Sequence, residues 1–137
     1  MLFLNNKFKK MLTDKKVKAF VITADAAAAK KFYGEVLGLK FLTEDDYGLT
    51  FEMNNTFLRI SITNKENAAP QKNTVLGWTV PNIDESVDFL KGKGIIFEKY
   101  NFLQQDENGI WEAPDGTKVA WFKDPNGNVL SIDQQGN

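Results

Sequence analysis

The stretch DAAAAKKFYGEVLGL, residues 25–39, has the pattern of a short helix with a defined start and end. Asp25 suits the N-cap position, because its carboxylate can accept hydrogen bonds from backbone N–H groups of the first turn. Alanines of high helix propensity follow, and Phe32 and Val36 recur at helical spacing. Gly38 suits the left-handed residue that closes a helix. The sequence therefore predicts one helix between Asp25 and Gly38.

Short apolar and β-branched runs on both sides of this helix predict strands. The run before it, residues 17–23, is typical of a strand buried on both faces. Three more strands are expected near residues 39–43, 48–53 and 56–63, and Asn54-Asn55 is a two-residue hairpin signal between the last two. Residues 64–73 are polar with one proline, so we expect them to connect two halves of the chain.

The same order of elements is expected again after this connection. A strand over residues 74–80 precedes an amphipathic helix over residues 83–91, which Gly94 terminates. Further strands are predicted near residues 95–100, 117–123 and 128–133. The separation along the sequence between Phe32 and Phe89 equals that between Phe41 and Phe97 to within one residue. This spacing indicates that one strand-helix-strand-strand-strand unit is duplicated.

With 137 residues, the chain has the common size of a single domain. We expect that domain to span residues 17–137, with modules at residues 17–63 and 74–134. Residues 1–16 are expected to form a flexible lead, and whether residues 1–10 belong to the native product stays open. The apolar start turns polar at Asn5, too early for a signal peptide or a membrane span, so a cytoplasmic location is expected.

Composition excludes several classes of function. Lys and Arg total 17 against 18 Asp and Glu, with no long block of either sign, so neither nucleic acid nor a membrane surface is an expected partner. The chain has no cysteine and no histidine, which excludes disulfides, thiolate metal sites and catalysis by either residue. A metal ion would need oxygen ligands from Asp, Glu, Asn or Gln.

Two motifs resemble the signatures of the vicinal oxygen chelate superfamily, which includes glyoxalase, extradiol dioxygenases, and bleomycin- and fosfomycin-resistance proteins. They are FYGEVLGL at residues 32–39 and DPNGNVL at residues 124–130. The stretch from residue 109 to residue 123 further resembles small bacterial members. The resemblance covers nearly everything from Val17 to Gln134. It implies an α+β fold in which two tandem βαβββ modules form a curved sheet around a cavity.

Enzymes of that superfamily hold a metal ion at four positions, usually with His, Gln or Glu. Matched to this sequence, the four positions fall on Lys18, Arg59, Val75 and Ser131. Two cations, an alkyl group and a neutral hydroxyl would repel a divalent ion or fail to bind it. Shifting the match by one residue brings in no good ligand either. The resemblance therefore implies a member with no catalytic metal and no cofactor, and we assign no catalytic residue.

Alternation of side chains along the strands places several of these residues on the concave face of the expected sheet. The face would be mostly apolar with an aromatic wall and a cationic corner, which suits a planar or amphiphilic anion. The candidate ligand-binding residues are Lys18, Phe20, Phe57, Arg59, Ser61, Gly77, Trp111 and Ser131.

Most of these candidates have a structural alternative. Phe20 and Phe57 are equally suited to an ordinary core, and Arg59 could form an ion pair with Glu52. Trp111 could cover either the mouth of the cavity or a dimer interface. For the remaining tryptophans we expect Trp121 in the core and Trp78 under the second helix, and we expect the pair Asp45-Asp46 to be a solvated turn without function.

The leading hypothesis is a homodimeric protein that binds and sequesters a small molecule without metal, as the bleomycin-resistance proteins do in crevices between two subunits. One alternative is a glyoxalase-like lyase or isomerase, with metal ligands placed elsewhere or with a metal-free mechanism that uses Arg59 and water. Another is a structural or regulatory protein, which we expect if Phe20, Arg59 and Trp111 are sealed by packing. Whether the modules pair within one chain or across a dimer stays open.

Overall fold

The computed structural model describes residues 11–137. The first module contains β1 (Lys18–Thr23), α2 (Ala26–Lys31), a π-helical turn η1 (Phe32–Val36), β2 (Lys40–Asp45), β3 (Gly48–Met53) and β4 (Thr56–Ile62). The second contains β5 (Thr74–Thr79), α3 (Ile83–Gly92), β6 (Trp111–Glu112), β7 (Lys118–Lys123) and β8 (Val129–Gln134). Of the expected flexible lead, residues 1–10 lie outside the described residues, and residues 11–16 are exposed.

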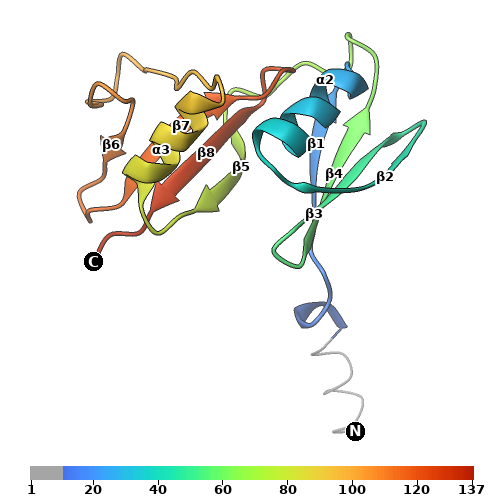
Figure 1. Ribbon diagram of the computed structural model, residues 1–137, viewed down its shortest axis with the longest axis horizontal. Coiled ribbons are helices and arrows are strands. Elements are labelled where there is room, and N and C mark those ends of the chain that lie inside the picture. Colours follow the sequence, from blue (N-terminus) through green and yellow to red (C-terminus); the bar gives the residue numbers. More distant parts are fainter. Residues whose placement is uncertain (1–10) are drawn as a thin grey trace, which may run out of the picture.

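Each module forms a four-stranded mixed sheet, with strand orders β1-β4-β3-β2 and β5-β8-β7-β6. In both sheets the first strand pairs in parallel with the last strand of its module, and the other pairs are antiparallel. Figure 1 shows the two sheets side by side, with α2 and α3 on the same side of the molecule. The prediction of an α+β fold made of two tandem modules is confirmed.

The hairpin predicted at Asn54-Asn55 is present between β3 and β4. Both residues have positive φ angles, 45° and 63°, as a type I′ turn requires. The strand predicted at residues 95–100 is wrong. Glu98 donates one backbone hydrogen bond to Trp121 of β7 (2.8 Å), but β6 is the strand that pairs with β7, so residues 95–100 make no ladder.

The helix predicted between Asp25 and Gly38 is divided in two. Asp25 is the N-cap of α2 as expected, and its carboxylate accepts a hydrogen bond from the backbone N–H of Ala28 (3.0 Å). The chain then widens into the π-helical turn η1, which rotates the following side chains relative to a regular α-helix. As a result two consecutive side chains, Phe32 and Tyr33, are both buried.

One hydrophobic core lies on the helix side of both sheets. Phe32 of the first module contacts Phe122 of the second, with ring centroids 6.4 Å apart. Val87 and Leu90 of α3 are buried in the same core, as their predicted inward position requires. Residues of both modules therefore contribute to one buried core. No helix within residues 11–137 has the length and apolar character that a membrane span requires.

The turn at residues 124–128 joins the modules through buried polar groups. The hydroxyl of Tyr33 donates to Oδ2 of Asp124 (2.6 Å), and both residues are buried. Asn128 donates through Nδ2 to the same oxygen (2.8 Å) and to the backbone carbonyl of Ile22 in β1 (2.8 Å). Asn126 donates to the carbonyl of Ala68 in the connection between the modules (2.7 Å). The second sequence signature is thus a structural junction.

Candidate functional site

The face of the first sheet that points away from the helices carries five of the predicted ligand-binding residues. Along β1 and β4 the alternate residues Val21, Leu58 and Ile60 are buried in the core, so their neighbours point the other way. We call this surface the first open face; its residues are Lys18, Phe20, Ile22, Phe57, Arg59 and Ser61. In the parallel β1–β4 register, Lys18 lies opposite Phe57, Phe20 opposite Arg59, and Ile22 opposite Ser61.

Large apolar side chains of the first open face are exposed. Phe20 is 61% exposed and Ile22 is 40% exposed. Phe57 is half-buried, and the ammonium of Lys16 lies 4.7 Å from its ring centroid. Packing within the chain therefore leaves Phe20 and Ile22 open to solvent, whereas the side chain of Arg59 is largely covered.

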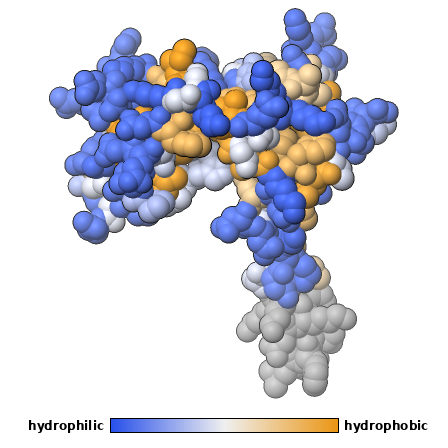
Figure 2. All heavy atoms as spheres, in the orientation of Figure 1, coloured by the Kyte–Doolittle hydropathy of each residue, from blue (hydrophilic) through white to orange (hydrophobic). Residues whose placement is uncertain are grey.

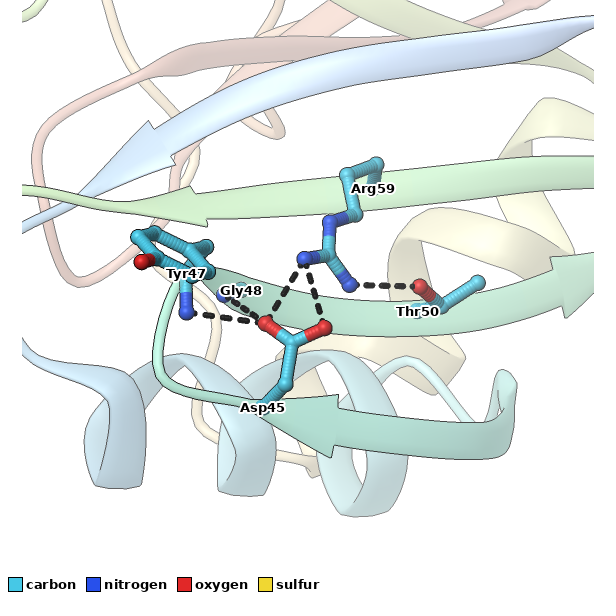
Figure 3. A network of polar contacts seen from close by, with 5 residues as sticks. All are labelled: Asp45, Tyr47, Gly48, Thr50 and Arg59. Carbon is cyan, nitrogen blue, oxygen red and sulfur yellow. Dashed lines mark hydrogen bonds and ion pairs between the residues drawn. The ribbon is translucent and has the colours of Figure 1, made fainter.

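Arg59 is held across β3 by two partners (Figure 3). Its Nη1 donates to the hydroxyl of Thr50 (3.0 Å), and its Nη2 donates to both carboxylate oxygens of Asp45 (2.8 and 3.1 Å). The ion pair considered from sequence, between Arg59 and Glu52, is absent among the described residues, because Glu52 instead pairs with Lys16 and Lys40. Arg59 therefore has an anionic partner, but a different one.

Gly48 makes room for the guanidinium. A Cβ atom at this position would lie 2.8 Å from Nε of Arg59, 2.9 Å from its Cζ and 2.6 Å from the carbonyl oxygen of Ile60. A side chain at this position would displace the guanidinium of Arg59 from the start of β3. The glycine is therefore required for the observed position of the one guanidinium on this face.

Asp45 has a second task in the turn between β2 and β3. Its Oδ1 accepts hydrogen bonds from the backbone N–H groups of Tyr47 (2.8 Å) and Gly48 (3.0 Å). The bond from Tyr47, followed by that from Arg59, lowers the pKa of the Asp45 carboxyl below its usual value, so the group is ionised at neutral pH. Sequence reasoning treated Asp45-Asp46 as a solvated turn and missed the contact with Arg59.

The corresponding face of the second sheet holds the other three predicted residues. Gly77 of β5 lies opposite Ser131 of β8, and a Cβ on Gly77 would collide with the Ser131 hydroxyl. Ser131 is buried. Trp111 lies in β6, and its ring packs on Trp121 with centroids 6.3 Å apart. Trp111 thus covers Trp121 on this face.

Trp121 is not in the core, contrary to expectation. Its neighbours Ala120 and Phe122 are buried on the helix side, so Trp121 points to the opposite face, directly across from Ser131. Tyr100 packs edge-on against it with centroids 5.6 Å apart. Burial raises the pKa of the Tyr100 hydroxyl above its usual value. We call the residues of this feature the aromatic row: Tyr100, Phe102, Trp111 and Trp121.

The side chains on these faces do not fit the metal ion that is used by enzymes of the superfamily that the sequence resembles. Lys18 and Arg59 are two of the four positions matched to the metal ligands. They do not face each other across β1 and β4, because Arg59 lies opposite Phe20. The carboxylates of these faces already have partners. Glu52 pairs with Lys16 and Lys40, Asp45 pairs with Arg59, and Oδ1 of Asp133 accepts the hydroxyl of Thr79 (2.9 Å). Among residues 11–137, no three His, Cys, Asp or Glu side chains are grouped so that they could hold a metal ion.

A groove lies on the helix side of the molecule, between α3 and the segment that follows η1. This groove has a volume of about 580 Å³. Its walls include Leu37, Trp78, Phe89 and Ile132, so Trp78 lines the groove together with Phe89 of α3. Figure 2 shows apolar residues gathered where the two modules meet on this side. None of the eight predicted ligand-binding residues lines the groove.

The sequence matches the family model of the Glyoxalase/Bleomycin resistance protein/Dioxygenase superfamily over residues 16–132. A search of curated proteins found no match to the sequence.

Among solved structures, an antibiotic binding protein, TnmS3 from Streptomyces sp. CB03234, is 21% identical with a TM-score of 0.70, covering 92% of this chain and 99% of that one. Lactoylglutathione lyase from Agrobacterium tumefaciens is 15% identical with a TM-score of 0.67, covering 88% and 93%. A glyoxalase/bleomycin resistance protein/dioxygenase from Alicyclobacillus acidocaldarius is 17% identical with a TM-score of 0.69, covering 90% and 93%. These structures share the fold.

Proposed function

The chain belongs to the Glyoxalase/Bleomycin resistance protein/Dioxygenase superfamily, and from that premise we propose that it binds a small amphiphilic or anionic organic molecule without a metal ion. The observation that carries the proposal is the first open face, where Phe20 and Ile22 of β1 are exposed and Arg59 of the neighbouring β4 extends its guanidinium over β3. Apolar surface gathered around a fixed charge is typical of a binding face.

Binding rather than catalysis is favoured by the chemistry of the side chains. A ligand bound here would meet aromatic rings, alkyl groups, hydroxyls and one guanidinium. The metal-based reactions of the superfamily need several oxygen or nitrogen donors around one ion, and no three His, Cys, Asp or Glu side chains of residues 11–137 are grouped to supply them. The antibiotic binding protein among the structural relatives supports the same assignment.

We further propose that a second copy of the chain closes the site. The first open face and the aromatic row lie on sheet faces that point away from the shared core, so each leaves one side for another molecule. A homodimer that brings the first open face of one copy near the aromatic row of the other would enclose a ligand between an aromatic wall and Arg59.

The proposal is tested with two fluorescent probes of matched skeleton, anionic 8-anilinonaphthalene-1-sulfonate and neutral N-phenyl-1-naphthylamine. Both are expected to bind the purified protein, with unchanged affinity after dialysis against EDTA. Phe20→Ser should weaken binding about tenfold or more, because a buried ring contact of roughly 1.5 kcal/mol is lost. Phe89→Ser is the matched control, since Phe89 has a similar exposure, 63%, but lies on the helix-side groove.

Two results would contradict this function. One is that Phe89→Ser abolishes probe binding while Phe20→Ser leaves it intact, which would move the site to the groove. The other is that the protein has a catalytic activity that chelation removes and a transition metal restores. Turnover of a hemithioacetal by the metal-loaded protein would then support a glyoxalase-type lyase instead, the reaction class of the structural relative from Agrobacterium tumefaciens.

A further inference from the structure

We infer that the ligand of the first open face is an aromatic carboxylate or sulfonate whose anionic group replaces Asp45 as the partner of Arg59. The inference rests on the proposed function and adds to it the chemical class of the ligand. It also gives Asp45 a defined role, because this carboxylate holds the anion site of Arg59 in the absence of ligand.

The two members of the ion pair differ in how firmly they are held. The side chain of Arg59 is 18% exposed and that of Asp45 is 56% exposed. Nη1 of Arg59 is held by its hydrogen bond to Thr50, and the guanidinium occupies the space that the missing side chain of Gly48 leaves. These two contacts do not depend on the anionic partner, so the guanidinium stays on the open face when that partner changes. Asp45 meets it from the solvent side. Because Asp45 is more than half exposed, water screens its attraction to Arg59, and another anion can compete for the guanidinium from the same side.

The exchange leaves the turn intact. Oδ1 of Asp45 also accepts the backbone N–H groups of Tyr47 and Gly48, and these two bonds do not involve Arg59. When a ligand anion takes the Nη2 donor of Arg59, Asp45 loses one partner, keeps two and gains water. The ligand gains a charge-assisted hydrogen bond to a guanidinium that is already oriented. No covalent bond forms or breaks.

The surroundings of Arg59 indicate why the anion should be attached to an aromatic ring. Phe20 lies directly opposite Arg59 in the β1–β4 register and is exposed. The guanidinium extends from β4 over β3, away from β1 (Figure 3), so a ligand with its ring on Phe20 carries its anionic group across β4 to reach Arg59. The other charges of this face are already paired, with Glu52 between Lys16 and Lys40, or lie at the start of β1, as Lys18 does.

The test compares Asp45→Asn with Glu44→Gln. Asparagine keeps a side-chain oxygen for the turn but removes the negative charge that competes for Arg59. Glu44→Gln changes the net charge equally on the neighbouring residue of β2, where Glu44 pairs with Lys30 instead. Both variants and the parent protein are titrated with anionic 8-anilinonaphthalene-1-sulfonate and with neutral N-phenyl-1-naphthylamine.

Asp45→Asn is expected to bind the sulfonate about three- to tenfold more tightly than the parent, with no change for the neutral probe. Glu44→Gln should change neither affinity, and in an Arg59→Gln background Asp45→Asn should have no effect. An equal gain in both charge variants, or no gain in Asp45→Asn, overturns the inference while leaving the proposed function standing. A parent protein that binds neither probe overturns both.

Discussion

Replacement of Tyr33 by phenylalanine removes one hydroxyl from the junction between the modules. That hydroxyl donates to Oδ2 of Asp124 at 2.6 Å, and both residues are buried. A buried hydrogen bond to a carboxylate contributes about 1.5–3 kcal/mol, and the ring itself stays in place, so no large cavity adds to the loss. We expect the free energy of unfolding to fall by about 1.5–3 kcal/mol and the melting temperature by about 5–10 °C.

The same variant has a defined pH dependence. Burial, followed by the negative charge of Asp124 and the hydrogen bond to it, raises the pKa of Tyr33 far above its usual value of 10.0. Above about pH 10 the unfolded chain releases the tyrosine proton while the folded chain keeps it, so the parent protein loses stability as pH rises. Phenylalanine cannot ionise, and the difference in stability between parent and Tyr33→Phe should therefore shrink above pH 10.

Urea denaturation followed by circular dichroism, between pH 7 and pH 11, measures both effects. Tyr47→Phe is the control, because Tyr47 is exposed and lies in the turn between β2 and β3, outside the junction. Tyr33→Phe with the stability of the parent at pH 7 would refute the reasoning. A stability difference that stays constant up to pH 11 would refute the assignment of the raised pKa.

Two further predictions concern glycines that face polar groups. Gly48→Ala should cost about 1–3 kcal/mol of stability in urea denaturation and should weaken binding of the sulfonate probe more than that of the neutral probe, because the new Cβ displaces Arg59 and presses on the carbonyl of Ile60; an equal effect on the two probes would contradict the described position of Arg59. Gly77→Ala should destabilise the fold through its collision with the Ser131 hydroxyl, and Ser131→Ala should recover part of that loss in a double-mutant cycle; additive losses would contradict it.

Local sequence patterns were sufficient for most of the fold. Turn residues such as Asn54-Asn55 and caps such as Asp25 act on their own neighbours, so their effects are visible within a few residues. The π-helical turn and the failed strand at residues 95–100 depend on tertiary contacts. Tyr33 is drawn toward Asp124 in the other module, and the edge of β7 is paired with β6, a segment more than ten residues further along the chain.

The candidate site was predictable to the extent that strand alternation decides it. Alternation placed Phe20, Phe57 and Arg59 on one face, as the structure has them. It could not identify Asp45 as the partner of Arg59, because that contact crosses β3 from a turn. Trp121 was expected in the core because it lies in a strand. Side chains alternate along β7, however, so the burial of Phe122 places Trp121 on the opposite face.

The central claim, that an organic ligand and not a metal ion occupies the first open face, is tested most directly by a crystal structure of the protein grown with 8-anilinonaphthalene-1-sulfonate. We predict the dye rings against Phe20 and Phe57, with a sulfonate oxygen within hydrogen-bonding distance of Arg59 and with Asp45 turned toward solvent. Dye bound instead between Trp78 and Phe89, or a transition metal ion coordinated by side chains of the two sheets, would contradict it.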